Sequence, residues 1–424
     1  MIRSRRAAPP RAPEFDRLIA LDGLRGLAAL TVVLAHFTLR WSSEMNGESL
    51  YPYGDRFVDF WLPIADLLLF GVNLFFVVSG FVMVKMLARS TGLCDFMLRR
   101  IARLWPMLFL CATATTLIIN LSGFPLRFET THYWEVTPFE YLSSIFFIDP
   151  AFLGPFFGRP WASWVDGVYW TLWIDVRFYV LVAAVYWIWS GPRQFARAWV
   201  CVQLASLGLL MIALFTPLQL PKLLELILQP QYLAWFTVGI AAAYLVDDPD
   251  SSEGRWLALS AAGSMLFAAL VSSTFIPDKD WFDILVLYIL VLMPFLLIVM
   301  NTPGIMSIFT HPIAVVIGMA SYPLYIFHEA SGVVVMNLLA DAGVPVSLIL
   351  PLMLALAVTV AMLLHKIFEK SARRVILQIG QPGVVWSERA FPNLRFKREE
   401  KTLNNTEVQR ALITQADKPA RGKT

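Results

Sequence analysis

Ten apolar windows separated by shorter polar segments constrain the fold of this chain more than any other feature. Each is long enough, or nearly so, to cross a hydrocarbon layer of about 30 Å as a helix. They cover roughly residues 18–38, 62–86, 104–121, 168–189, 197–216, 231–246, 256–274, 282–300, 313–338 and 346–367. Composition agrees, because 58% of the 424 residues are hydrophobic and only 15% are charged, unlike an ordinary soluble domain. We expect an all-α, polytopic membrane helix bundle with about ten transmembrane helices, of which the sixth is the shortest.

The distribution of charge predicts the orientation of these helices. Segments 1–17 and 85–103 and the start of the C-terminal tail are rich in Lys and Arg, whereas 39–61 and 122–167 carry only two such residues each. Cytosolic loops carry an excess of Lys and Arg, so both termini are expected in the cytosol. Loop 247–255 is acidic, but acidic residues weigh little in this rule.

Three regions follow from these patterns. Residues 1–17 are expected to form a cytosolic tail, 18–375 the membrane domain, and 376–424 a flexible cytosolic tail. The N-terminal arginines and the apolar run after them resemble a signal peptide, but Asp22 and Arg25 lie inside the run and no small-residue cleavage site is clear, so we expect a retained span. Three scattered cysteines lack metal-type spacing, and no metal site or disulfide framework is expected.

The first span carries three polar groups that are costly in a membrane unless they face protein or water. Arg25 and His36 are eleven residues apart, which is about three helical turns, so both lie on nearly the same face about 16 Å apart. Asp22 and Arg25 are neighbours at i,i+3. With the N-terminus inside, Arg25 lies toward the cytosol and His36 toward the outer face. Histidine is the commonest general base, although an interfacial polar role is an equal alternative for His36 alone.

Two further motifs follow in the chain. Ser79-Gly80 lies in the second span, where small residues most often mediate close helix packing. Arg100 and Arg103 lie on the cytosolic side at the expected start of the third span. They serve as a positive-inside anchor or, in the sharper interpretation, as a phosphate site in which guanidinium groups and helix-start amides share an anion.

Later polar residues are candidates to surround the first span. Asp175 and Arg177 in the fourth span require partners in an apolar setting. Tyr325 and His328 share a face of the ninth span at i,i+3, where structural hydrogen bonding is the alternative to function. Glu369 lies among basic residues and is expected at a solvated helix end.

Together these stretches resemble the acyltransferase-3 family of integral-membrane O-acyltransferases, in family order over about residues 15–375. The matching stretches are Leu21 to Gly26 with His36, Phe75 to Phe81, Arg99 to Arg103 with Pro106, Trp170 to Leu172 with Phe178-Tyr179, and Ser321 to Tyr325 with His328. One departure is that Asp175, Val176 and Arg177 follow Trp170-Thr171-Leu172, where the family usually has glutamate after Trp-Ser-Leu.

The resemblance implies a membrane O-acyltransferase, and the style of the chain suits a bacterial inner membrane. Its donor would be cytosolic acetyl-CoA or another acyl-CoA, and its acceptor a hydroxyl of an extracytoplasmic glycan or lipid-linked sugar. His36 would act as general base or carry the acyl group itself, Arg25 would neutralise negative charge, and Asp22 would hold Arg25. Donor binding would involve Arg100, Arg103, Ser79 and Gly80, and Asp175, Tyr325 and His328 would orient His36 or the acceptor.

Other classes remain open at this point. A transporter or exporter of a small polar or glycan-related substrate would also place polar residues within spans, but it predicts internal repeats, and none is apparent. A glycan-binding scaffold would not need Arg25 and His36 on one face. No permanently bound cofactor and no nucleic-acid partner is expected, and the sequence does not predict an oligomeric state.

Overall fold

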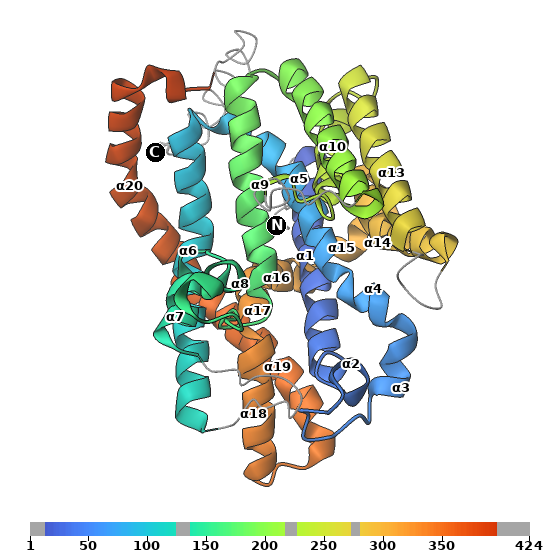
Figure 1. Cartoon of the computed structure of the whole chain (residues 1–424), viewed down its shortest axis with the longest axis vertical. Helices are drawn as coiled ribbons and strands as arrows, with labels where there is room; N and C mark the ends of the chain where they lie inside the picture. The colour runs from blue at the N-terminus through green and yellow to red at the C-terminus, as the bar shows by residue number, and fades with distance from the viewer. Residues whose placement is uncertain (1–12, 124–135, 217–226, 273–279, 397–424) are drawn as a thin grey trace, which may run out of the picture.

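The computed structural model describes residues 13–123, 136–216, 227–272 and 280–396, and every regular element in these ranges is helical (Figure 1). The long helices are α1 (Pro13–Thr38), α5 (Gly71–Arg89), α6 (Leu93–Ser122), α9 (Tyr169–Ile188), α10 (Pro192–Phe215), α12 (Leu233–Asp247), α13 (Ser252–Ser272), α14 (Trp281–Val299), α18 (Glu329–Asp341), α19 (Val346–Leu364) and α20 (Lys370–Ala390). The short ones are α2 (Ser43–Asn46), α3 (Val58–Trp61), α4 (Ala65–Leu69), α7 (Pro138–Ile145), α8 (Pro150–Leu153), α15 (Pro303–Phe309), α16 (Pro312–Met319) and α17 (Ser321–Phe327).

The number of membrane-crossing helices is smaller than the number of apolar windows. In the described ranges, eight helical stretches are long and apolar enough to cross a membrane, and the pair α17–α18, bent by 67°, makes a possible ninth. The sixth window forms α12, which has only 15 residues. The predicted all-α polytopic bundle is thus confirmed, with eight or nine helices that could span a membrane by their length and composition. The cytosolic placement of both termini stays a prediction.

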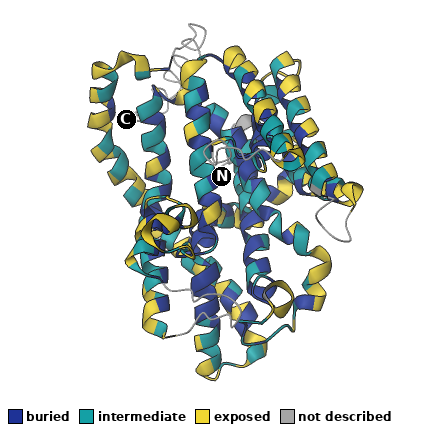
Figure 2. Ribbon diagram, in the orientation of Figure 1, coloured by how far each residue is buried: buried dark blue, intermediate teal, exposed yellow. Residues whose placement is uncertain are grey.

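Helix α1 is the central element of the bundle. It contacts α5 along one side and α15, α16 and α17 along another, and Leu24, Ala28 and Val32 are fully or almost fully buried. Figure 2 shows the buried residues concentrated in the interior of the bundle and the exposed ones along its outer helices. The side chains of Arg25 and His36 on this helix are also mostly buried, at 21% and 12% exposure.

Glycines permit a very close helix contact between α5 and α12. A Cβ on Gly80 would lie 2.0 Å from the carbonyl oxygen of Phe236, and one on Gly239 would lie 1.9 Å from that of Val77. Both distances are far below van der Waals contact, so the two backbones touch only because neither position has a side chain. These contacts support the interpretation that Gly80 allows close helix packing.

Gly239→Ala is expected to lower the unfolding temperature of the purified protein. The added methyl group meets backbone atoms of α5 that cannot rotate away, and overpacking of this kind costs about 1–3 kcal/mol. A matched control is Gly263→Ala in α13, where the methyl group would enter open space. Equal unfolding temperatures for the two variants would contradict this account of the α5–α12 contact.

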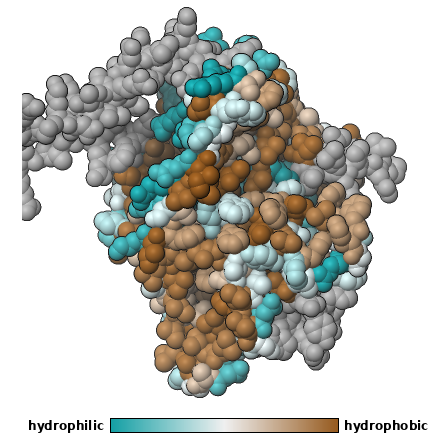
Figure 3. All heavy atoms as spheres, turned by 90° about the vertical axis from the view of Figure 1, so that its left-hand side faces the viewer, coloured by the Kyte–Doolittle hydropathy of each residue, from teal (hydrophilic) through white to brown (hydrophobic). Residues whose placement is uncertain are grey.

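The outward faces of the helices are apolar. Figure 3 views the molecule from the left-hand side of Figure 1 and shows hydrophobic residues over much of that face. Helix α6 exposes Leu117 and Leu121, at 52% and 80% of their surface. In the outer segment predicted at 122–167, the aromatic residues Phe156 and Trp161 are also mostly exposed. An apolar exterior of this kind suits contact with lipid rather than water.

The C-terminal region differs from the expected flexible tail. Helix α20 continues α19 through a π-helical turn at His365–Glu369 and ends at Ala390, packed against α6. The predicted boundary at residue 376 therefore falls inside a helix. The apolar pattern weakens there because α20 has one face on α6 and the other exposed. The remaining predicted tail, residues 397–424, lies outside the described residues, as do residues 1–12 of the predicted N-terminal tail.

Candidate active site

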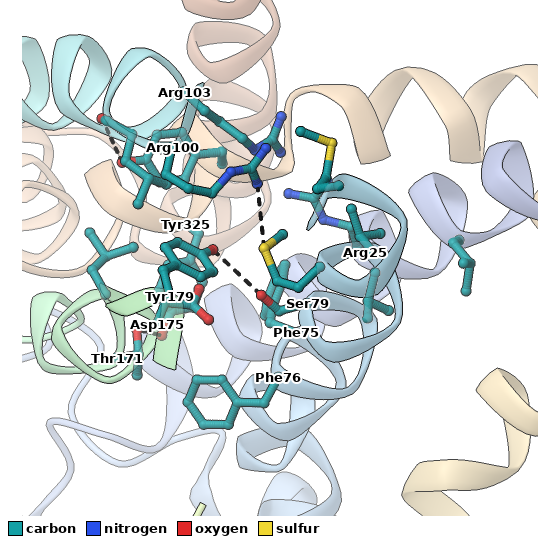
Figure 4. Close-up of a pocket in the computed structure, with 18 of the residues that line it drawn as sticks. Arg25, Phe75, Phe76, Ser79, Arg100, Arg103, Thr171, Asp175, Tyr179 and Tyr325 are labelled. Atoms are coloured by element: carbon teal, nitrogen blue, oxygen red, sulfur yellow. Dashed lines mark hydrogen bonds between the residues drawn. The ribbon is translucent and has the colours of Figure 1, made fainter. Parts of the chain in front are cut away.

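A cavity of about 510 Å³ lies between six helices from distant parts of the chain: α1, α5, α6, α9, α17 and α20 (Figure 4). Its polar lining consists of Asp22, Arg25, Ser79, Arg100, Arg103, Thr171, Asp175, Tyr179, Tyr322, Tyr325 and Arg373. Seven of the sequence-predicted site residues thus meet in one cavity, which has the size of a small-molecule pocket. His36, His328 and Gly80 do not line it.

One part of the cavity is strongly cationic. Arg25, Arg100, Arg103 and Arg373 all line it. Arg25 Nη1 lies 3.5 Å from Asp22 Oδ1, so the pairing expected from their i,i+3 spacing is confirmed. Arg100 is buried, with 6% of its surface exposed. Its Nε has no hydrogen-bond partner within the described part of the chain. A buried donor without an acceptor is costly, and a bound anion would satisfy it.

Helix α6 corrects one detail of the predicted phosphate site. The helix begins at Leu93, so Arg100 and Arg103 lie in its third turn and not at its start. Backbone amides in a helix interior donate to carbonyls four residues earlier and cannot share an anion. The predicted contribution of helix-start amides is therefore wrong, and only the guanidinium groups are available to a ligand.

Hydroxyl and carboxyl groups line the cavity beside the arginines. Figure 4 shows Ser79, Asp175 and Tyr179 pointing toward one another, and the Ser79 and Tyr179 hydroxyl oxygens are 3.4 Å apart. Asp175 Oδ1 is buried without a hydrogen-bond partner in the described ranges. Arg177 is not part of the lining; its Nε donates to the Trp173 carbonyl at 3.3 Å.

Tyr325 marks the boundary between this cavity and the two histidines. Its hydroxyl lies 2.9 Å from that of Thr171 at the cavity wall, while its ring centroid is 6.0 Å from that of His328. His328 Nε2 in turn lies 2.9 Å from His36 Nδ1, and the two imidazole rings are stacked. A short line of side chains therefore joins the cavity to His36.

The bend between α17 and α18 sets the protonation of both rings. His328 stands at this bend, and its Nδ1 lies 2.8 Å from the Tyr325 carbonyl and 3.2 Å from the Leu324 carbonyl, which the end of α17 leaves without helical partners. A carbonyl only accepts, so Nδ1 carries the proton and Nε2 of a neutral His328 is an acceptor. His36 Nδ1 must then donate to it, which leaves the lone pair on His36 Nε2.

His36 keeps limited access to its surroundings. Its side chain is 12% exposed, whereas His328 is 2% exposed. The hydroxyl of Tyr51 donates to the backbone carbonyl of His36 at 2.6 Å, which fixes the end of α1. An oriented, neutral imidazole with an unprotonated Nε2 is the form that a general base requires.

A second cavity of about 470 Å³ extends the cationic end of the first. The two share Asp22, Arg25, Arg103 and Arg373. The second adds Lys370, Arg374, His365 and Glu369. The expectation of a solvated helix end for Glu369 is wrong, since the residue is 8% exposed and its Oε2 lies 2.7 Å from His365 Nδ1. The π-helical turn before α20 rotates it inward.

Several residues near these sites were not anticipated. Tyr179 and Arg373 join the cavity, Glu329 lies beside His36, and Asp166 accepts a hydrogen bond from the backbone next to Glu329. Asp166 precedes a glycine near the end of the long outer segment, and Glu329 directly follows His328. Charged residues inside or next to apolar windows were the available signal, but only the bend at His328 turns Glu329 inward.

Comparison with known proteins places these features in a family. A family model described as an acyltransferase domain, acyltransferase-3, matches residues 18–366. A protein of Acidianus two-tailed virus named as a candidate acetyltransferase is 27% identical over 312 residues, which is 72% of this chain and 80% of the relative. Nodulation protein 10 of Rhizobium leguminosarum bv. viciae is 29% identical over 145 residues, covering 32% of this chain and 38% of the relative.

A third relative, from Staphylococcus aureus strain COL and named as a candidate O-acetyltransferase, is 24% identical over 364 residues, which is 77% of this chain. The chain spans about half of that relative, 52% of its length. The comparison with solved structures returned no match. Because the family model covers most of the sequence, the chain belongs to the acyltransferase-3 family and is a multi-pass membrane acyltransferase.

Proposed function

We propose that the protein transfers an acyl group, most simply acetyl, from a cytosolic acyl-CoA to a hydroxyl group of an extracytoplasmic glycan or lipid-linked sugar. The single observation that carries the proposal is the line of residues from the arginine-rich cavity through Tyr325 and His328 to His36. A bacterial inner membrane, with the cationic cavity on the cytosolic side, is the setting that suits such a donor.

The donor would enter at the cationic end. Its phosphate groups would bind Arg100, Arg103 and Arg373, because guanidinium groups form strong charge-assisted hydrogen bonds with phosphate. Arg25, paired with Asp22, would neutralise negative charge of the donor or of the transition state. The pantetheine arm would lie beside Ser79 of α5. The neighbouring Gly80 lets α5 pack closely on α12, which positions this wall of the cavity.

The reaction would take place near His36. The acceptor oxygen attacks the thioester carbonyl carbon while His36 Nε2 takes its proton. The carbon–sulfur bond then breaks, and the leaving thiolate receives the proton from the imidazolium, so that an ester and a free thiol result. Here His328 holds the His36 tautomer, and Asp175 and Tyr325 orient the donor carbonyl or the acceptor. In a variant of this path, His36 Nε2 itself accepts the acyl group before passing it on.

Release of free CoA tests the proposal against transport. Purified protein in detergent is incubated with acetyl-CoA, with and without an extract of bacterial cell-envelope glycans, and free thiol is measured. We expect thiol release that increases with the extract and saturates with acetyl-CoA. A transporter moves its substrate without chemical change, so no thiol release above that of a protein-free control would contradict the proposed function.

A further inference from the structure

Two buried carboxyl groups have no role in the reaction as described so far: Glu329, which lies beside His36, and Asp166, which interacts with Glu329. Asp166 precedes α9 and is 0% exposed, and Glu329 opens α18 and is 2% exposed. Glu329 Oε2 lies 3.9 Å from His36 Nδ1, and its Oε1 lies 3.8 Å from Arg40 Nε. Asp166 and Glu329 come from segments more than 160 residues apart in the chain, so the tertiary fold brings them together.

The backbone around them holds the carboxyl groups in place. Asp166 accepts hydrogen bonds from the backbone N–H groups of Ala330 at 3.1 Å and Val168 at 3.3 Å, and its carboxyl group is close enough to interact electrostatically with that of Glu329. Gly167 makes room for this arrangement, since a Cβ there would lie 2.4 Å from Glu329 Oε2. The close approach of the carboxyl groups therefore depends on a residue without a side chain.

The charge on this pair follows from its burial. Two neighbouring carboxylates repel strongly away from water, so such a pair retains one proton and one negative charge. Accordingly, burial and the neighbouring Glu329 raise the pKa of the Asp166 carboxyl well above its usual range. One buried negative charge requires a nearby cation. Arg40 lies on one side of Glu329, and His36 lies on the other.

We propose that the Asp166–Glu329 pair provides the counter-charge for His36 when its ring takes the proton of the acceptor hydroxyl. The proton moves from the hydroxyl oxygen to His36 Nε2 and later to the leaving thiolate. The proton shared by the carboxyl groups stays where it is. Asp166 and Glu329 are thus positioning residues that act through His36, and this inference rests on the proposed function.

Three variants alter the pair in different ways. Glu329→Gln and Asp166→Asn keep the shape of each side chain and leave the negative charge to the other carboxyl group, and Gly167→Ala displaces the Glu329 carboxyl group. Glu329→Gln and Gly167→Ala move the charge away from His36 and are each expected to lower kcat roughly 10²-fold, the lower end of what a positioned base contributes. Asp166→Asn leaves the charge on Glu329 and is expected to lower kcat less. In all three variants the KM for acetyl-CoA changes less than about twofold, because neither carboxyl group lines the donor cavity. The assay is thiol release from acetyl-CoA with the glycan extract.

The double variant Asp166→Asn/Glu329→Gln tests whether the two groups act as a unit. A single retained charge predicts that the double variant lowers kcat further than either single variant, because in each single variant the remaining carboxyl group can still carry the negative charge. Gly263→Ala is the matched control for Gly167→Ala and is expected to keep wild-type kcat. Unfolding temperatures separate catalytic loss from misfolding.

Two results would overturn the inference. One is wild-type kcat in folded Glu329→Gln, and the other is a loss of kcat in the three variants that is matched by an equal rise in the KM for acetyl-CoA. If Glu329→Gln does not fold, Gly167→Ala decides by the same criteria. Failure of the proposed function looks different, because the wild-type protein itself would then release no thiol and His36→Ala would change nothing.

Discussion

His36→Ala is expected to lower the rate of acyl transfer by about 10²–10⁴-fold, the usual contribution of a positioned general base. The reason lies in the chain of hydrogen bonds that ends at this residue. The carbonyls at the end of α17 hold the proton on His328 Nδ1, and His328 holds the proton on His36 Nδ1. His36 Nε2 is therefore free to take a proton from an acceptor, and alanine has no such group.

A matched control for this variant is His311→Ala. His311 caps the N-terminus of α16 at the outside of the bundle. It does not line the donor cavity and is not one of the two stacked histidines. Loss of a cap costs roughly 0.5–2 kcal/mol of stability, so a lower unfolding temperature with unchanged turnover is expected. Full acylation activity in His36→Ala, measured in membranes that contain equal amounts of protein, would refute the role of His36.

The double variant Arg100→Ala/Arg103→Ala is expected to raise the KM for acyl-CoA by about two orders of magnitude or more. Hydrogen bonds to charged groups contribute about 1.5–3 kcal/mol each, and every 1.4 kcal/mol corresponds to about a factor of ten in affinity. Turnover at saturating donor should change much less, because these side chains lie in the cavity at a distance from His36. The measurement is the dependence of initial rate on acetyl-CoA concentration.

Arg99→Ala provides the comparison on the same helix. Arg99 pairs with Asp95 at 2.9 Å and does not line the cavity, so its removal is expected to leave the donor dependence unchanged. If the double variant showed the same dependence on acyl-CoA as Arg99→Ala, the positive-inside interpretation of Arg100 and Arg103 would be sufficient and no phosphate site would be needed.

The sequence predicted much of the architecture because apolar windows and helices coincide in a membrane protein. It predicted Asp22 beside Arg25, and the structure confirms this pair. It underestimated the lengths of α6 and α20, because an apolar window shows how much of a helix is apolar and not where the helix begins or ends. Both helices continue into charged segments that pack on each other. This extension also moved Arg100 away from the helix start on which the predicted amide contacts depended.

The surroundings of His36 were harder to predict. The contact between His36 and His328 joins residues 292 positions apart and depends on the bend between α17 and α18. No local pattern near Glu329 indicates that bend, and no helical periodicity relates Asp166 to it. The sequence therefore indicated the polar residues of single helices, while the carboxyl pair became visible only through the tertiary structure.

The location of the label after incubation with labelled acetyl-CoA tests the central claim most directly. Purified wild-type protein and His36→Ala are reconstituted in sealed vesicles and incubated with the donor and the glycan extract, and glycan, protein and donor fractions are then separated. The account predicts alkali-labile label in the glycan fraction with the wild-type protein and almost none with His36→Ala. Label that stays in intact acetyl-CoA with both proteins, or that crosses the membrane unchanged, would contradict it.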